Sequence, residues 1–209
     1  MLKSKMMKIQ NLSEEKIRQK LEEFSPSPGN LLYPATTRIG GLQYSAVLMP
    51  LFQTNGSWHL LFIRRTAITG DAHSGQVAFP GGRSTPGEAR PEVTALRETQ
   101  EEIGLPPQEV GIIGYLNQTR TVTNYIIFPV IGIIPWPYPL KLSPLEVSRV
   151  FTIPLEWLAE PGNYDQDYYT LPASNIPIPV IHFKPYDGEI LWGASARITV
   201  DFLKILQVI

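Results

Sequence analysis

Two adjacent glycines that lead into an acidic helix are the feature that most constrains this fold. Gly81 and Gly82 follow a proline, and glycine allows the backbone to approach a neighbouring group closely. The segment from Pro91 to Ile103 then has the pattern of a helix, with proline suited to its first turn. Gly104 stands where glycine commonly ends a helix. We therefore expect a glycine-rich loop followed by a helix over about 91–103.

Three glutamates share one face of this predicted helix. Glu98, Glu101 and Glu102 are three and four residues apart, and residues at that spacing are neighbours on a helix. Each like-charged pair costs an exposed helix about 0.2–0.5 kcal/mol. A divalent cation among the acids would offset that repulsion, and oxygen ligands suit Mg²⁺ or Mn²⁺, which in turn suit a phosphate-containing substrate. The alternative is a solvated acidic face without a ligand.

The opposite face of the same helix is predicted to be apolar. Val93, Leu96 and Ile103 are spaced by three and seven residues, which indicates a stripe that faces the core. We therefore expect the acids to point outward and to line a surface or a cleft. Arg97 stands beside the acids and is predicted to pair with one of them, which would hold that side chain in one rotamer.

The rest of the chain predicts strands around two main helices. A leading helix is expected at 11–24 with Ser13 as its N-cap, and a Pro/Ser/Gly/Asn stretch at 25–30 separates region 1–30 from a main domain at 31–209. A last helix is expected at about 194–208. Strands are predicted at 41–53 and 58–65, around an Asn-Gly turn, and at 110–116, 125–134, 150–152, 180–183 and 189–192. This order predicts an α/β fold, an α/β/α sandwich over a mixed sheet.

The loop and the acidic helix resemble the Nudix box, the signature of hydrolases that act on nucleoside diphosphates linked to another group. The interval from Glu88 to Arg97 is one residue longer than in the general pattern, as in the coenzyme A pyrophosphatase branch of that family. Thr99 stands where an aliphatic residue is usual. The matching positions are Gly82, Glu88, Arg97, Glu98, Glu101, Glu102, Gly104 and Leu105.

Segments outside the box resemble the same coenzyme A pyrophosphatase branch. Residues 60–65 and 74–82 are similar to its upstream signature, and residues 186–188 and 190–197 to its closing segment. The resemblance spans roughly residues 41–205. It implies that the main domain is a Nudix hydrolase domain with a Nudix-like α/β/α sandwich.

The resemblance also implies roles for individual residues. Glu98, Glu101 and Glu102 would bind Mg²⁺, with Mn²⁺ as a substitute. Glu101 would be the general base or a ligand of a second metal ion, and Arg97 would fix the acids in place. Strand alternation sends Arg64 and Arg65 to opposite faces, so at most one of them is expected to reach a phosphate. The candidate substrate-binding residues are Arg64, Arg65, Gln76, Gly81 and Gly82.

The expected reaction is hydrolysis of the diphosphate bond of coenzyme A or acyl-coenzyme A. The products would be 4′-phosphopantetheine, or its acyl form, and adenosine 3′,5′-bisphosphate. Two alternatives stay open. The first is the same chemistry on ADP-ribose or another nucleoside diphosphate derivative. The second is a nucleotide-sensing module without turnover, which the presence of all three glutamates disfavours.

Composition narrows the class of partner. A net charge of −1 in 209 residues, without a run of Lys or Arg, argues against nucleic acid as the partner. The absence of cysteine excludes disulfides and thiolate metal sites. No signal peptide and no membrane-spanning run are expected. We therefore expect a cytoplasmic protein whose partner is a small nucleoside diphosphate derivative, with a homodimer as the candidate assembly.

Overall fold

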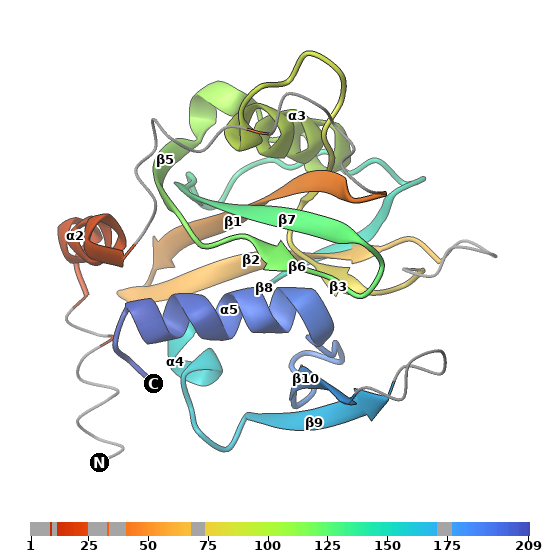
Figure 1. Cartoon of the computed structure of the whole chain (residues 1–209). Helices are drawn as coiled ribbons and strands as arrows, with labels where there is room; N and C mark the ends of the chain where they lie inside the picture. Colours follow the sequence, from red (N-terminus) through yellow and green to blue (C-terminus); the bar gives the residue numbers. More distant parts are fainter. Residues whose placement is uncertain (1–8, 10–11, 25–32, 34–40, 68–73, 171–176) are drawn as a thin grey trace.

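The computed structural model describes residues 9, 12–24, 33, 41–67, 74–170 and 177–209. A central sheet lies between helices, with α3 (Pro91–Ile103) on one side and α5 (Gly193–Ile205) on the other (Figure 1). The predicted α/β/α sandwich is therefore confirmed. The predicted break at 25–30, and with it the boundary between the leading region and the main domain, lies outside the described residues.

The main sheet has eight strands and mixed pairing. Its path runs β3-β2-β1-β7-β5, while β4 pairs with β1, β6 with β7 and β8 with β2. β1 and β7 are parallel, and the other strand pairs described in this sheet are antiparallel. The bounds are β1 (Gln43–Thr54), β2 (Ser57–Arg65), β3 (Val77–Ala78), β4 (Gly81–Arg83), β5 (Gly111–Tyr115), β6 (Thr119–Arg120), β7 (Tyr125–Ile133) and β8 (Val147–Pro154).

The central strand β1 contributes to the core on both of its faces. Met49 and Leu51 belong to one apolar cluster, which also contains Phe202 of α5. Leu48 and Phe52 point the other way and join two clusters on the side of α3. Because both faces are covered, β1 has an almost continuous apolar sequence in place of strict alternation.

The hairpin between β1 and β2 forms at the predicted Asn-Gly turn. Asn55 and Gly56 both have positive φ, 50° and 78°, as a type I′ turn requires. The turn sets the register of the two strands, in which Thr54 is paired with Ser57 and Leu51 with Leu60. The Asn-Gly turn therefore determines where β1 ends and where β2 begins, and β2 then runs back toward the glycine loop.

The leading helix α2 (Glu14–Phe24) packs against β5 and α5. The hydroxyl oxygen of Ser13 accepts a hydrogen bond from the Lys16 amide at 3.3 Å, which agrees with its predicted role as N-cap. Ile17 and Leu21 are buried in the large cluster shared with α5. Just before the helix, the Leu12 carbonyl accepts a buried hydrogen bond from the Trp58 indole at 2.7 Å.

The strands in the C-terminal third of the chain differ most from the predicted ones. The predicted strand at 189–192 is wrong, because only the isolated bridges Tyr186–Glu189 and His182–Trp192 occur there. A separate two-stranded sheet joins β9 (Tyr164–Thr170) to β10 (Pro177–Phe183), and β9 was not predicted. Two short elements complete the described chain, η2 (Pro107–Glu109) and α4 (Leu155–Leu158).

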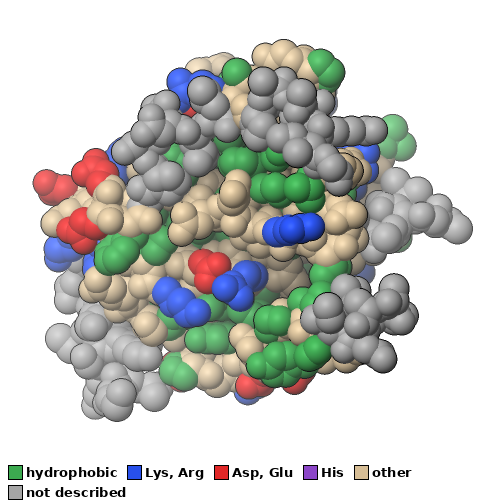
Figure 2. All heavy atoms as spheres, in the orientation of Figure 1, with side chains coloured by type: hydrophobic (Ala, Val, Ile, Leu, Met, Phe, Trp, Pro, Cys, Tyr) green, Lys and Arg blue, Asp and Glu red, His purple; other side chains and the backbone are tan. Residues whose placement is uncertain are grey.

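Charged side chains are dispersed over the surface in view. On the face drawn in Figure 2, the coloured Lys and Arg side chains lie between apolar and uncharged ones or beside acidic ones. Within the described ranges, no helix has the length and the apolar composition that a membrane crossing requires.

The end of α3 provides a test of how tightly the helix is packed. Gly104 and Gly56 both have positive φ, so alanine at either position is expected to cost about 1–2 kcal/mol of stability. A Cβ at Gly104 would lie 2.9 Å from the Lys141 carbonyl oxygen, whereas a Cβ at Gly56 meets nothing within 4 Å. We therefore expect Gly104→Ala to lower the free energy of unfolding by about 1 kcal/mol more than Gly56→Ala. Urea unfolding of both variants checks this, and equal losses would contradict it.

Candidate active site

The buried face of α3 differs from the predicted one. Val93 is 48% exposed and Leu96 only half-buried, so the predicted apolar stripe is wrong except at Ile103. Ala95 and Thr99, at the next helical spacing, are fully buried instead. These short side chains allow the helix to lie close to the sheet. The residues buried on α3 are Pro91, Glu92, Thr94, Ala95, Thr99, Glu102 and Ile103.

This rotation of the helix moves one of the three acids inward. Glu102 is only 2% exposed, so the expectation that all three acids point outward is wrong for this residue. The side chain of Glu98 is 19% exposed and that of Glu101 54% exposed. The three carboxylates therefore lie in a gradient from the interior to solvent.

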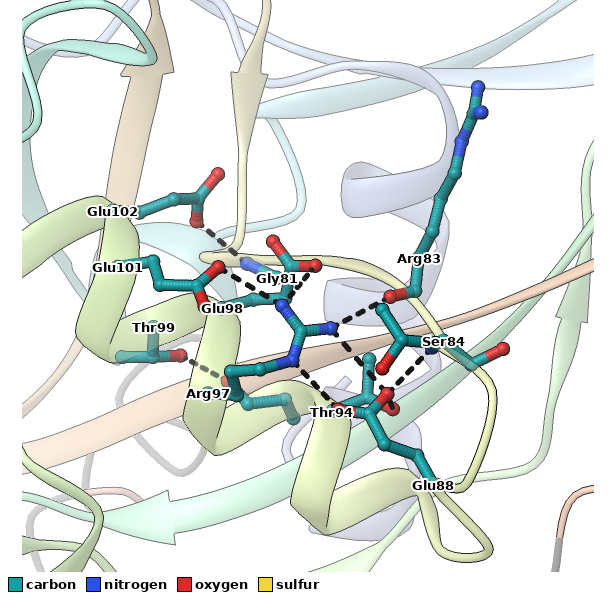
Figure 3. A network of polar contacts seen from close by, with 12 residues as sticks. Gly81, Arg83, Ser84, Glu88, Thr94, Arg97, Glu98, Thr99, Glu101 and Glu102 are labelled. Carbon is teal, nitrogen blue, oxygen red and sulfur yellow. Dashed lines mark hydrogen bonds and ion pairs between the residues drawn. The ribbon is translucent and has the colours of Figure 1, made fainter.

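The two glycines of β4 receive the buried acids. The Gly81 amide donates a hydrogen bond to Glu102 Oε2 at 2.8 Å (Figure 3). A Cβ at Gly82 would collide with the carboxylate of Glu98. Both glycines pair with β1, at Val47 and Ala46. The glycine pair therefore forms a cradle in which two carboxylates lie against the edge of the sheet.

Arg97 connects this cradle to the preceding loop. Its Nε donates to Glu88 Oε1 at 2.7 Å, and its Nη1 donates to Glu98 Oε1 at 2.9 Å and to Glu101 Oε2 at 3.0 Å (Figure 3). Its Nη2 donates to the Arg83 carbonyl at 3.0 Å. The sequence predicted pairing with one of the neighbouring acids; the structure has pairing with two of them and with Glu88. These contacts raise the pKa of the guanidinium further above its usual range.

Burial shifts the pKa values of the two inner acids upward. Burial raises the pKa of Glu102 to about 8, against the lowering effects of the Gly81 amide and the charge of Arg65. Burial also raises the pKa of Glu98, with a partial offset from the hydrogen bond and charge of Arg97. Both carboxylates are thus held where a negative charge is unfavourable unless a positive charge is supplied.

The donor set fits a hard divalent cation, although the acids are not gathered around a single point. Among the described residues, no three His, Cys, Asp or Glu side chains form a ready-made metal cluster. Glu102, which is buried, and Glu98, which is partly buried, nevertheless offer carboxylate oxygens at Gly81 and Gly82. A cation would relieve their mutual repulsion, which is one cause of the raised pKa of Glu102. Oxygen donors of this kind suit Mg²⁺ or Mn²⁺.

The two arginines at the end of β2 lie on opposite sides, as strand alternation predicts. Arg64 Nη1 pairs with Glu189 Oε2 at 3.0 Å. Arg65 Nη1 lies 3.8 Å from Glu102 Oε1, on the side of the acids. The Arg65 amide also donates to the Gln76 carbonyl at 2.9 Å, so Gln76 lies beside the same strand end. Of the two arginines, Arg65 is therefore the one beside the inner acid.

Two residues near the acids were not found from the sequence. Glu146 precedes β8, and its charge contributes to the raised pKa values of both Glu98 and Glu102. A single acid in an apolar loop gives no sequence signal for this placement. Thr94 is fully buried and donates to Glu88 Oε2 at 2.6 Å. Its position one turn before Arg97 places it on the helix face beside the loop that contains Glu88.

Comparison with known proteins places this arrangement in a family. Residues 42–173 match the NUDIX domain. The chain belongs to the Nudix hydrolases. The protein named uncharacterized Nudix hydrolase NudL from Photorhabdus laumondii is 32% identical to this chain, and the match covers 79% of this chain and 86% of that protein. The protein of the same name from Salmonella paratyphi B is 39% identical, and the match covers 74% of this chain and 78% of that protein. The fold is similar to the crystal structure of a MutT/nudix family protein from Enterococcus faecalis, at a TM-score of 0.56 and 15% identity, over 94% of this chain and 80% of that one.

Membership of the Nudix hydrolase family defines the general class of reaction. As a Nudix hydrolase, the protein is a pyrophosphatase that acts on phosphoanhydride bonds. Nudix hydrolases generally use divalent metals, which agrees with the oxygen donors at the glycine cradle.

The ion pair between Glu88 and Arg97 can be tested through the pH dependence of stability. The hydrogen bonds and charge of Arg97, with the contacts from Thr94 and Thr85, outweigh burial and lower the pKa of Glu88 to about 2. A lowered pKa stabilises the fold above the unfolded value of about 4.5, and that stabilisation is lost as the pH falls from 4.5 toward 2. We expect Glu88→Gln to lower the free energy of unfolding by about 2–3 kcal/mol at pH 7, and by progressively less below pH 4.5.

Urea unfolding at pH 7, 4 and 3 measures this dependence. Glu14→Gln is the matched control, because Glu14 pairs with Arg18 at 2.7 Å on the surface, with side chains 46% and 42% exposed. Exposed pairs contribute about 0–1 kcal/mol. A difference between wild type and Glu88→Gln that stays constant with pH would contradict the assignment.

Proposed function

We propose that this protein is a Mg²⁺-dependent coenzyme A pyrophosphatase, with Mn²⁺ as an effective substitute. It hydrolyses coenzyme A or acyl-coenzyme A to 4′-phosphopantetheine, or its acyl form, and adenosine 3′,5′-bisphosphate. The observation that carries the chemistry is the pair of carboxylates at the Gly81–Gly82 cradle, the buried Glu102 and the partly buried Glu98. The similarity of residues 60–65, 74–82 and 190–197 to the coenzyme A branch supports this choice of substrate.

The proposed role of each residue follows from its position in the site. When bound, a divalent cation supplies Lewis acidity to the phosphoryl oxygens and lowers the pKa of water. Glu98 and Glu102 would hold it, and the Gly81–Gly82 backbone would line the same place. Glu101 is proposed as the general base, because its side chain is the most exposed of the three and can meet a water molecule. Arg97 bridges Glu98 and Glu101 through one shared nitrogen, which holds both carboxylates in place.

Arg65 is proposed to contact the diphosphate. Its guanidinium lies 3.8 Å from Glu102 Oε1, so a phosphate bound at that carboxylate through a cation would also be near the arginine. Gln76, whose carbonyl accepts a hydrogen bond from the Arg65 amide, and the two glycines are proposed to line the same substrate site. Arg64, which the sequence also suggested, pairs with Glu189 on the other side of the strand.

A second candidate substrate class follows from the same site. ADP-ribose and other nucleoside diphosphate derivatives contain the same scissile bond, and the acids would act on them by the same chemistry. A nucleotide-sensing module without turnover is disfavoured by the buried acids at the cradle, since their burial has a cost that a catalytic cation would offset. We propose a cytoplasmic enzyme, with a homodimer as the candidate assembly.

The metal assignment is tested by charge removal at the two inner acids. We expect Glu98→Gln and Glu102→Gln each to lower kcat at least about tenfold, which corresponds to about 1.4 kcal/mol in the barrier. Both variants are expected to weaken Mn²⁺ binding in calorimetry, and circular dichroism is expected to show that each is folded. Glu14→Gln is the surface control. Retention of more than about a tenth of wild-type kcat by both inner variants would refute the assignment.

The substrate assignment is tested by a panel at fixed Mg²⁺. We expect kcat/KM for coenzyme A to exceed that for dephospho-coenzyme A and for ADP-ribose by about tenfold or more, the effect of one charge-assisted contact to the 3′-phosphate worth about 1.5–3 kcal/mol. Both poorer substrates lack the 3′-phosphate. Equal hydrolysis of all three would remove the coenzyme A assignment and leave the pyrophosphatase chemistry in place.

A further inference from the structure

Thr94 occupies an unusual place for a buried hydroxyl. Its side chain is completely buried in α3, yet its Oγ1 donates to a side chain outside the helix, the Glu88 carboxylate, at 2.6 Å (Figure 3). Thr99 is equally buried on the same helix, and its Oγ1 donates to the Ala95 carbonyl of its own helix, also at 2.6 Å. The hydroxyl of Thr94 therefore holds the loop, whereas that of Thr99 only satisfies the helix.

We propose that Thr94 is a positioning residue for the acidic site, and that it acts through Glu88 and Arg97. This proposal rests on the function proposed above. Within the part of the chain that the structure describes, Thr94 makes no hydrogen bond to any of the three acids, so its effect depends on a chain of two intermediate side chains. Each step of that chain is a hydrogen bond in the structure.

The first step is the orientation of the Glu88 carboxylate. Oε2 accepts from the Thr94 hydroxyl and, at 2.8 Å, from the Thr85 amide, while Oε1 accepts from Arg97 Nε at 2.7 Å. Thr85 lies on the same loop as Glu88, so its contact moves with the loop. Thr94 and Arg97 are thus the two partners that tie this carboxylate to α3. Threonine has few rotamers in a helix, whereas arginine has many, so Thr94 supplies the more rigid of the two attachments.

The second step is the orientation of the Arg97 guanidinium. Its Nε is fixed by Glu88, and its Nη1 donates to both Glu98 and Glu101. The guanidinium is planar, so a rotation about Nε moves Nη1 away from the two acids. A Glu88 carboxylate that turns without its Thr94 contact would therefore shift the donor on which the acids depend.

The central test is Thr94→Val, which keeps the shape and removes the hydroxyl. We expect kcat for coenzyme A to fall about tenfold with KM changed by less than about twofold, and Mn²⁺ affinity to weaken several-fold, as for partners of metal ligands elsewhere. Thr99→Val is the matched control and is expected to keep kcat and Mn²⁺ affinity within about twofold of wild type. Thr94→Ser, which restores the hydroxyl, is expected to recover most of both.

A second test asks whether Thr94 acts through Glu88. In a Glu88→Gln background, adding Thr94→Val is expected to change Mn²⁺ affinity by less than about twofold, because the path is already broken. Independent, multiplicative losses would overturn the proposed path. Circular dichroism and urea unfolding establish that each variant is folded before the comparison.

The outcomes separate this proposal from the proposed function. If wild type binds Mn²⁺ and hydrolyses coenzyme A, but Thr94→Val does so equally well, the positioning role is wrong and the function stands. Equal losses in Thr94→Val and Thr99→Val would assign the effect to packing and also overturn the role. If wild type neither binds Mn²⁺ nor hydrolyses coenzyme A or ADP-ribose, the proposed function fails and the positioning role fails with it.

Discussion

The guanidinium of Arg97 is the interaction on which the geometry of the acidic site depends. It contacts Glu88 and the Arg83 carbonyl on the loop side, and Glu98 and Glu101 on the helix side. One planar group with donors in fixed directions therefore sets the loop against α3 and spaces two carboxylates at the same time. Because the loop follows β4, which contains both glycines, this attachment also fixes where the glycine cradle meets the helix.

The close approach of α3 to the sheet explains both how the glycine cradle forms and why the carboxylates in it are unfavourably removed from water. Ala95 and Thr99 are short and fully buried, and Gly81 and Gly82 offer no side chains in return. The helix can therefore sit near enough for Glu102 to accept a hydrogen bond from the Gly81 amide. The same proximity takes carboxylates out of water, which is unfavourable for a charged group. Proteins that bury carboxylates at such a cost in stability do so, as a rule, at a functional site.

Sequence predicted the elements that carry local signals and missed what tertiary packing decides. Proline at its start and Gly104 at its end gave the bounds of α3, and Asn55-Gly56 gave the first hairpin. The rotation of α3 was predicted wrongly, because small buried residues, not the stripe with Val93, determined the inner face. β9 is exposed along almost its whole length, so it has no apolar alternation to find. Glu146 reaches the acids through the fold of a loop, which no spacing encodes.

Alternation at the end of β2 joins the acidic site to the C-terminal segment. Arg65 lies beside Glu102, while Arg64 turns to Glu189, a residue that is 6% exposed and also pairs with Arg149 of β8. Arg64 and Arg149 are direct cross-strand partners, and their like charges would repel without the carboxylate between them. The segment that contains Glu189 is therefore held on one side of the strand whose other side reaches the site. Effects of substitution at Arg64 consequently act through this docking, whereas those at Arg65 act at the acids themselves.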